Sequence, residues 1–504
     1  MFHKYNWKLT ACFAGTFMFL VVIMFLSPLS SDDYRLLAYN FIGIKEAFLF
    51  NLQYANGRLL GNFLGYIIVN SLFLKIIVNA FLITALIFMI PSVLKIKKSW
   101  AYYVSFVLLL AMDPEIFGQV YSWTAGFNNY VPPVFFICLI ILLIERFADR
   151  IKTVFAHIVL VAVIIVLSVC SQLYLELNTL LNIALAIILV IVSKRSGERQ
   201  QFNLYLTCFC SLTIGAIIMF ILPKIFNASS PSYRGLQIGS VSIFIRSIAS
   251  NGIKLFTFLE NNTLLCCFLL LICGFLLVRK KDLFPKPAFV ALFFSEVVSF
   301  TFILCDGLFR ETMWLGHTIV IKQFAAALVG AIIFINLCVI LIRVYGKKGV
   351  KLYILIGLGL LSLAPMLIVH PVPKRTFFVG YVIIVSLIIS VMDDIYKEHH
   401  FDNYNHMITN KVVIATSLGT VLFFLAMFLG IHTLDVNRER HIVSEMNKHV
   451  DNIEIYRIPS KYVYWDEEWC FTYYYYYETP KDIQFEAIDY ITWLGKYEDV
   501  SYDE

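Results

Sequence analysis

Charged side chains are scarce in this sequence. Of its 504 residues only 15% are Asp, Glu, Lys or Arg, whereas 60% are hydrophobic, and the mean hydropathy is +0.78. A soluble domain carries about 25% charged residues, so the shortage excludes an ordinary soluble protein and indicates a membrane protein. The net charge of +6 does not predict a nucleic-acid partner, because the Lys and Arg residues lie in short segments between apolar runs.

Several short motifs are missing as well. The sequence contains no glycine-rich nucleotide-binding loop, no disulfide framework, no zinc-ligand spacing and no internal repeat. All of its 11 cysteines except Cys470 lie in apolar runs, where a free cysteine behaves as a small hydrophobe. The first apolar run lacks a small-residue cleavage site, so we expect it to be retained as the first membrane helix.

Long apolar runs recur along the chain. A helix that crosses a bilayer needs about 20 mostly apolar residues. By this measure the sequence predicts an α-helical polytopic membrane protein with about thirteen transmembrane helices, which form a membrane domain over residues 1–431. The predicted spans are 9–28, 75–94, 100–116, 131–146, 153–170, 174–192, 202–222, 261–279, 287–305, 318–343, 350–369, 376–393 and 411–431.

Clusters of basic residues alternate between the predicted loops. Seven short segments on one side of the membrane, among them 95–98 and 279–281, carry Lys and Arg. The positive-inside rule makes that side cytoplasmic, which predicts a multi-pass protein of the plasma membrane with a cytoplasmic N-terminus. An odd number of spans then places residues 432–504 outside the cell. There we expect a small α/β domain with short strands near Val463–Trp465 and Tyr473–Tyr477.

Two adjacent carboxylates follow the first predicted span. Asp32 and Asp33 begin the first outer loop, residues 29–74, where a carboxylate gains nothing from lipid. A pair that faces an aqueous pocket suits a catalytic base or a metal ligand. The alternative is that the two acids cap the helix that begins near Tyr34, because Asp at an N-cap accepts backbone N–H groups.

The rest of this loop is amphipathic. Apolar residues recur at helical spacing over 34–50, a break follows at 54–58, and a second apolar stretch covers 59–73. We expect two helices that lie along the outer membrane surface. Gly57, Gly61 and Gly65 would allow the second helix to pack closely on a neighbour.

Polar and aromatic side chains gather in other outer segments. Asn128, Asn129 and Tyr130 offer amide and hydroxyl groups suited to sugar hydroxyls, and Trp123 could stack on a sugar face; an interfacial aromatic belt with helix caps is the alternative. Glu176 stands in the outer third of an apolar span, where an ionisable residue costs about 2.5–3.5 kcal/mol. It is either functional or one half of an ion pair with a basic loop residue.

Basic residues are few on the predicted outer side. Arg234 and Arg375 stand in short Pro-containing segments, and Arg58 and Lys374 are also outward. Arginine binds phosphate through two parallel hydrogen bonds, so these cations could hold the phosphate of a lipid-linked substrate. The alternative is that they snorkel to lipid headgroups.

The order of a first span, an acidic motif, two juxtamembrane helices and a second span resembles the C-type fold of integral membrane glycosyltransferases, and within that superfamily a bacterial branch. The resemblance covers roughly residues 1–430. The segments that carry it are Pro28–Tyr34, Asn56–Arg58, Trp123–Tyr130, Glu176–Thr179, Ser230–Arg234 and Pro373–Thr376.

This resemblance implies a function. It implies that the protein moves a sugar from a polyprenyl-phosphate-linked donor to a cell-envelope glycan, lipid or protein acceptor on the outer face, with inversion. Asp32 or Asp33 would be the base, and a divalent cation held by the two acids is one candidate cofactor. A lipid-linked glycan polymerase and a flippase or transporter of cell-surface polysaccharide are the alternatives. The implied donor-phosphate ligands are Arg58, Arg234, Lys374 and Arg375, and the implied sugar or acceptor ligands are Trp123, Asn128, Asn129, Tyr130, Glu176 and Tyr233.

Overall fold

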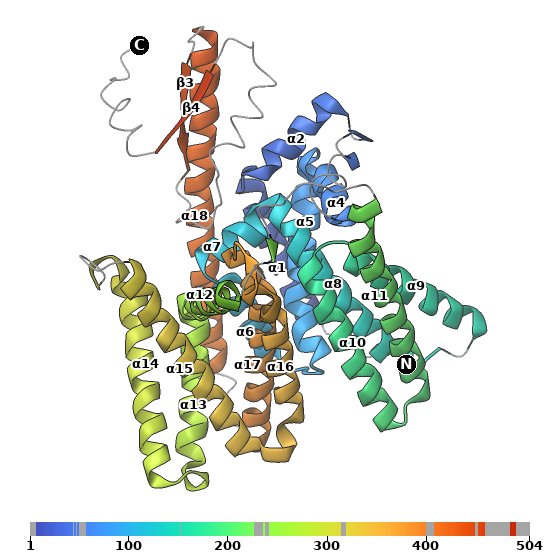
Figure 1. Cartoon of the computed structure of the whole chain (residues 1–504), viewed down its shortest axis with the longest axis vertical. Coiled ribbons are helices and arrows are strands. Elements are labelled where there is room, and N and C mark those ends of the chain that lie inside the picture. The colour runs from blue at the N-terminus through green and yellow to red at the C-terminus, as the bar shows by residue number, and fades with distance from the viewer. Residues whose placement is uncertain are drawn as a thin grey trace.

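The protein is built almost entirely of long helices (Figure 1). The computed structural model describes residues 7–43, 45–46, 48–49, 57–151, 153–225, 235–236, 241–313, 319–399, 408–448, 452–458 and 484–489. The long helices are α1 (Trp7–Leu26), α5 (Leu72–Val93), α6 (Ser99–Leu110), α8 (Thr124–Phe147), α9 (Val154–Gln172), α10 (Glu176–Ser196), α11 (Arg199–Ile225), α12 (Val241–Asn261), α13 (Thr263–Arg279), α14 (Lys286–Met313), α15 (Ile319–Tyr345), α16 (Val350–Leu363), α17 (Phe378–His399) and α18 (Ile408–Asn447).

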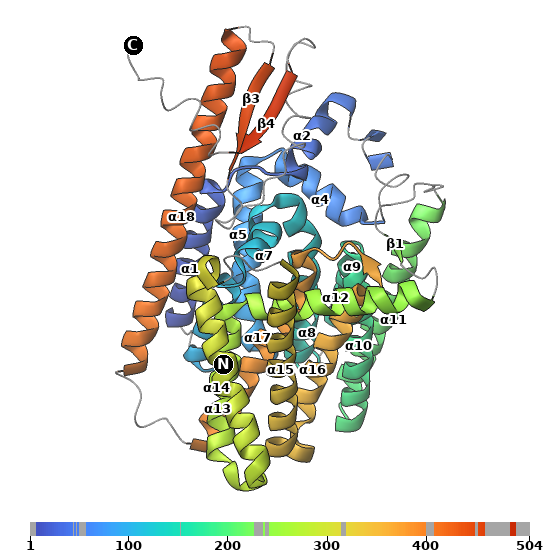
Figure 2. The ribbon, with the colours of Figure 1, turned by 60° about the vertical axis from the view of Figure 1, so that its left-hand side comes forward.

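The described helices make the protein a polytopic membrane protein. Ten of them are long and apolar enough to cross a membrane, or up to twelve if each of two bent helix pairs is one span. One bent pair is α6 with α7 (Pro114–Phe117) and the π-helical turn η1 (Gly118–Ser122), at 90°; the other is α12 with α13, at 82°. In Figure 2, α12 lies across the other helices instead of along them.

The first bend ends a predicted span early. The sequence predicts one span over 100–116, but α6 stops at Leu110 and the chain turns sharply before α7. Asp113 caps the start of α7, because its side chain accepts hydrogen bonds from the N–H groups of Glu115 (2.9 Å) and Ile116 (3.3 Å). Pro114 fits the first helical position, where no backbone donor is needed. The turned segment leads the chain to residue 123.

The first outer loop contains helices at both predicted places. They are α2 (Asp32–Ile42) and α4 (Leu59–Val69). A Cβ atom added to Gly61 would lie 2.6 Å from Oδ1 of Asn129, and one added to Gly65 would lie 3.2 Å from Nδ2 of Asn128. The close packing predicted for these two glycines is therefore confirmed, and the neighbour is α8.

Two of the predicted basic loops lie at the same end of the helix bundle. The ammonium of Lys98 lies 4.9 Å from the ring centre of Tyr396, near the end of α17, and Lys280 forms an ion pair with Glu398 on the same helix. The loops 95–98 and 279–281 therefore share one end of the bundle. Helices α2, α4 and α7 lie toward the opposite end (Figure 2).

The chain ends in a long helix and a small sheet. Helix α18 has 40 residues, and the predicted domain boundary at 431 falls inside it. Strands β3 (Asn452–Arg457) and β4 (Gln484–Asp489) pair in parallel, with Asn452 opposite Gln484. The hydroxyl of Tyr456 in β3 donates to the carbonyl of Leu434 in α18 (2.6 Å). The strands predicted at 463–465 and 473–477 lie outside the described residues.

Candidate active site

A small polar pocket opens between the first outer loop and the start of α8. Its volume is about 80 Å³. Helices α2, α4 and α8 and the short 3₁₀ turn η5 (Lys374–Phe377) contribute to its wall. The pocket brings together many of the residues predicted from the sequence, although they are far apart in the chain. These predicted residues are Asp32, Arg58, Trp123, Asn129, Tyr130 and Arg375.

The two acids of the motif have different surroundings. Asp32 lines the pocket, and its carboxylate lies 3.4 Å from the guanidinium of Arg35 one helical turn later. Asp33 is completely buried and does not line the pocket. Its carboxylate accepts hydrogen bonds from the backbone N–H groups of Ala125 (2.8 Å), Thr124 (3.1 Å) and Ser30 (3.3 Å).

Asp33 thus caps a helix that begins 91 residues later. Thr124 and Ala125 are the first residues of α8, whose N–H groups have no acceptor within the helix. A carboxylate at this end is also favoured by the helix dipole. The capping alternative predicted that the acids cap the helix that begins near Tyr34, whereas the observed cap joins the first outer loop to α8.

Burial and neighbouring charges act on Asp33 in opposite directions. Desolvation raises the pKa of its carboxyl group, the nearby Lys75 ammonium and the three N–H donors lower it, and the resulting pKa is about 6. Lys75 is itself buried near the start of α5, and its Nζ donates to the carbonyl of Ser27 (2.5 Å). The acidic motif is therefore held between a cation and a helix N-terminus.

The start of α8 contributes an aromatic ring and an amide with a buried, unpaired oxygen to the wall of the pocket. The guanidinium of Arg375 stacks 5.0 Å from the ring centre of Trp123. Asn129 donates from Nδ2 to the carbonyl of Ala125 (2.6 Å), and its Oδ1 has no hydrogen-bond partner among the described residues. Asn128, by contrast, is buried against α4 and does not line the pocket.

The predicted cations are divided between the pocket and ion pairs. Arg58 lines the pocket and also contacts both carboxylate oxygens of Glu176, with Nε–O distances of 2.9 and 3.1 Å. This pair fits the ion-pair alternative for Glu176. Arg375 donates to Oε1 of Gln119 (3.1 Å). Lys374 lies outside the pocket wall, where it pairs with Asp113 (3.4 Å) and Glu115 (3.1 Å).

Two predicted residues, Tyr233 and Arg234, lie outside the described residues. Their neighbour Gly235 pairs with His370 in a short antiparallel sheet formed by β1 (Gly235–Leu236) and β2 (Val369–His370). Because β2 leads into η5, the segment after α11 and the segment that carries Arg375 are joined by backbone hydrogen bonds.

The sequence did not identify Arg35, which lines the pocket, or Gln119, which holds the pocket residue Arg375. Arg35 stands three residues after Asp32, and this helical spacing could have placed both side chains on one face. Gln119 has no such signal, because it reaches Arg375 only through the bend between α6 and α8. In the part of the chain that the structure describes, no group of three or more His, Cys, Asp or Glu side chains could hold a metal ion.

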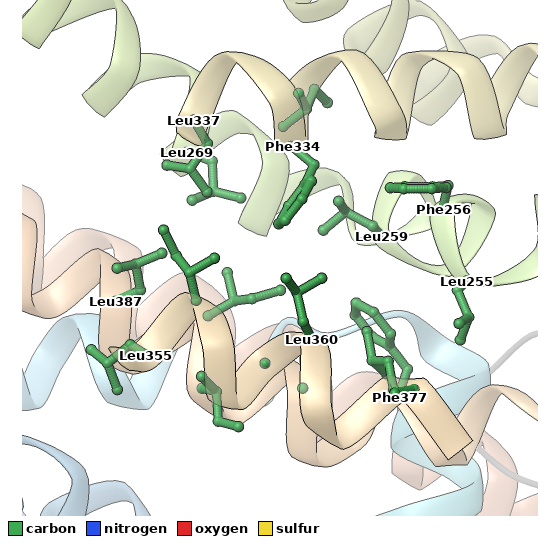
Figure 3. A pocket seen from close by; sticks show the side chains of 18 of the residues that line it. Leu255, Phe256, Leu259, Leu269, Phe334, Leu337, Leu355, Leu360, Phe377 and Leu387 are labelled. Atoms are coloured by element: carbon green, nitrogen blue, oxygen red, sulfur yellow. The ribbon is translucent and has the colours of Figure 1, made fainter. Parts of the chain in front are cut away.

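A second, apolar cavity adjoins the same turn η5. Its volume is about 320 Å³, and all residues in its wall are apolar. Figure 3 shows Leu255 of α12, Phe334 of α15 and Leu360 of α16 around it, with Phe377 of η5 at one side. Arg375 and Phe377, two residues apart, therefore belong to the polar pocket and the apolar cavity respectively.

Comparison of the chain with models of protein families, with curated proteins and with solved structures finds no match.

Proposed function

We propose that this protein is a membrane glycosyltransferase that moves a sugar from a polyprenyl-phosphate-linked donor to a cell-envelope glycan, lipid or protein acceptor, with inversion at the anomeric carbon. The proposal follows the resemblance to C-type glycosyltransferases. The observation that supports it best is the polar pocket, in which Asp32 lies together with the guanidinium groups of Arg58 and Arg375. The adjoining apolar cavity suits a hydrocarbon chain.

In this proposal Asp32 is the base, since Asp33 is buried and caps α8. The acceptor hydroxyl loses its proton to the Asp32 carboxylate, and its oxygen forms a bond to the anomeric carbon. The bond from that carbon to the phosphate oxygen breaks, and the polyprenyl phosphate leaves with the electron pair. Arg375 and Arg58 stabilise the charge that develops on the phosphate.

Trp123, Asn129 and Tyr130 would bind the transferred sugar. The indole ring gives a flat apolar face, and Asn129 supplies a polar amide to the wall of the pocket. Lys374 and Glu176 would act through the ion pairs that hold η5 and Arg58 in place. No step in this mechanism is routed through a metal ion.

The proposed orientation places the pocket on the outer face. If α15 and α16, which are separated by the turn Gly346–Gly349, cross the membrane separately, the upper count of twelve becomes thirteen. An odd number puts the two ends of the chain on opposite sides. A cysteine at Arg440, which is exposed on α18, should then react with an impermeant thiol reagent in intact cells, whereas one at Ser196, the exposed last residue of α10, should not. The reverse pattern would contradict this orientation.

The direct test is a transfer assay with the purified full-length chain. We would supply a panel of synthetic polyprenyl-phosphate hexoses together with cell-envelope acceptor fractions and measure the release of free polyprenyl phosphate. The expected result is release that depends on the acceptor and produces a glycosidic bond of inverted configuration. Movement of an intact lipid-linked sugar across a liposome membrane without release would favour a flippase and would reject the transferase.

A further inference from the structure

Helix α18 carries a buried pair of charges beside the acidic motif. Asp435 and Arg438 are 7% and 2% exposed, and their side chains lie 2.7 Å apart. The Arg438 guanidinium also donates to the hydroxyl of Tyr34, the residue that follows Asp33 (3.4 Å). A helix from the far end of the chain therefore contacts the motif directly.

Lys75 connects this pair to the other side of the motif. Its ammonium donates to the carbonyl of Ser27 just beyond the end of α1, and it interacts electrostatically with both Asp33 and Asp435. The result is a continuous series of alternating charges, Asp33, Lys75, Asp435 and Arg438, that ends on the Tyr34 hydroxyl. Buried charges are tolerated only when they are paired, so each member depends on its neighbours.

Apolar packing also stabilises the contact between Tyr34 and the C-terminal part of the chain. Tyr34 is buried in a small cluster with Ile442 of α18 and Ile453 and Ile455 of β3. The motif thus lies against the C-terminal helix and strand on one side and against α8 on the other.

We propose that Asp435 and Arg438 are positioning residues of the proposed site. Asp435 holds the Lys75 ammonium in place behind Asp33, and Arg438 holds Tyr34. Together they keep the Asp33 carboxylate on the first turn of α8, which carries the proposed sugar-binding residues. The site is then incomplete without α18. That the pocket is an active site rests on the proposed function, whereas the contact of α18 with the motif does not.

An ordinary pair within a helix does not account for the arrangement. Exposed pairs at this spacing contribute little to the stability of a helix, and a buried pair loses hydration that apolar residues would not lose. The same helix has a pair of the ordinary kind at Glu445 and Lys448, 2.9 Å apart, in which the lysine is 64% exposed. Glu445 therefore offers a matched control.

The N–H groups of Thr124 and Ala125 report this positioning directly. Their described acceptor is the Asp33 carboxylate, since first-turn amides have no partner within their own helix. We would measure hydrogen–deuterium exchange at these amides in the detergent-solubilised full chain. Asp435→Asn should accelerate exchange there by roughly tenfold, while peptides from α16 and α17 keep their protection and Glu445→Gln has no effect.

Exchanging the two charges distinguishes a pair that positions the motif from an ordinary ion pair within α18. The double variant Asp435→Arg with Arg438→Asp keeps a pair within the helix but turns a cation toward Lys75, so we expect exchange as fast as in Asp435→Asn. Protection equal to wild type in the double variant would overturn the proposal. If Asp435→Asn does not fold, Tyr34→Phe removes only the hydroxyl that Arg438 contacts, and unchanged exchange in that variant would also overturn it.

Activity provides a second and separate readout. If transfer is observed, Asp435→Asn should lower kcat with little change in KM for the donor, and Asp435→Glu should restore most of it. If no transfer is observed with any donor, the proposed function fails, whereas the exchange measurements still decide whether α18 positions the motif.

Discussion

The polar pocket and the apolar cavity share the turn η5 but are built in opposite ways. The pocket, about 80 Å³, depends on hydrogen bonds and ion pairs among side chains from distant segments. The cavity, about 320 Å³, is what remains where α12 crosses α15, α16 and α17. Under the proposed function, the pocket would determine the chemistry and the cavity would determine which lipid is held.

The largest effect should come from Asp32→Asn. Removal of a general base lowers turnover by about 10²–10⁴-fold, and the proposed role in the pocket predicts this loss without loss of polyprenyl phosphate binding. Initial rates and equilibrium binding would be measured on the same preparation. Wild-type turnover in this variant would show that the pocket does not contain the base.

The buried carboxyl group of Asp33, which lies behind the pocket, should affect the pH dependence of stability. Because the folded-state pKa of Asp33 is raised from 3.8 to about 6, the folded protein takes up a proton between about pH 6 and 4 that the unfolded chain does not. The free energy of unfolding should therefore rise by up to about 3 kcal/mol as the pH falls through this window, and this contribution is lost as the pH rises through 6. Thermal unfolding from pH 4.5 to 7 should show a weaker pH dependence in Asp33→Asn than in wild type.

Arg375→Ala should impair donor binding in the polar pocket and leave the apolar cavity on the other side of η5 unchanged. The loss of a charge-assisted contact should reduce donor affinity by roughly 10- to 100-fold, and turnover should fall as well because the phosphate gains charge during transfer. Arg375→Lys should recover only part of the loss, since an ammonium lacks the guanidinium fork. Arg279→Ala, in a basic loop at the other end of the bundle, is the control. Normal donor kinetics with weaker acceptor binding would assign Arg375 to the acceptor instead.

Filling the cavity should have the smallest effect and the most selective one. Gly252 lines the cavity, and a Cβ added there would meet only a Leu367 methyl at 3.9 Å, so a side chain can begin there without a clash and Gly252→Leu is the variant to test. We expect about tenfold weaker binding of long-chain polyprenyl phosphate, because lost burial costs about 0.8 kcal/mol per CH₂, and unchanged binding of isopentenyl phosphate. Gly274→Leu, at a glycine with open space outside this cavity, should change neither. Equal losses for both ligands would reject the cavity as the lipid site.

Local sequence signals predicted the parts of this fold that depend on local physics. Helical periodicity placed helices in the first outer loop, and the spacing of Gly61 and Gly65 indicated close packing. The Asp113-Pro114 pair is also a readable helix start, although hydropathy alone extended the preceding span through it. These features need only neighbouring residues to be recognised.

The remaining features depend on contacts between distant segments. The sequence marked Asp32 and Asp33 as a pair, but the capping of α8 by Asp33 joins residues 91 positions apart, so nothing near the motif distinguishes the two acids. Lys75 resembled any residue at the edge of a span, and its burial follows from the approach of α1 and α18. The apolar cavity is a matter of crossing angles, which hydropathy does not encode.

The unbroken course of α18 has a mechanical consequence. Its 40 residues span about 60 Å, twice the roughly 30 Å hydrocarbon thickness of a bilayer, so a large part of this one rod stands clear of the membrane. A stiff rod anchored in lipid converts a sideways load on its free end into tilt at its base. The base is where Tyr34 and the charge series lie, so a load on the free end of α18 would change the angle at which this helix meets them.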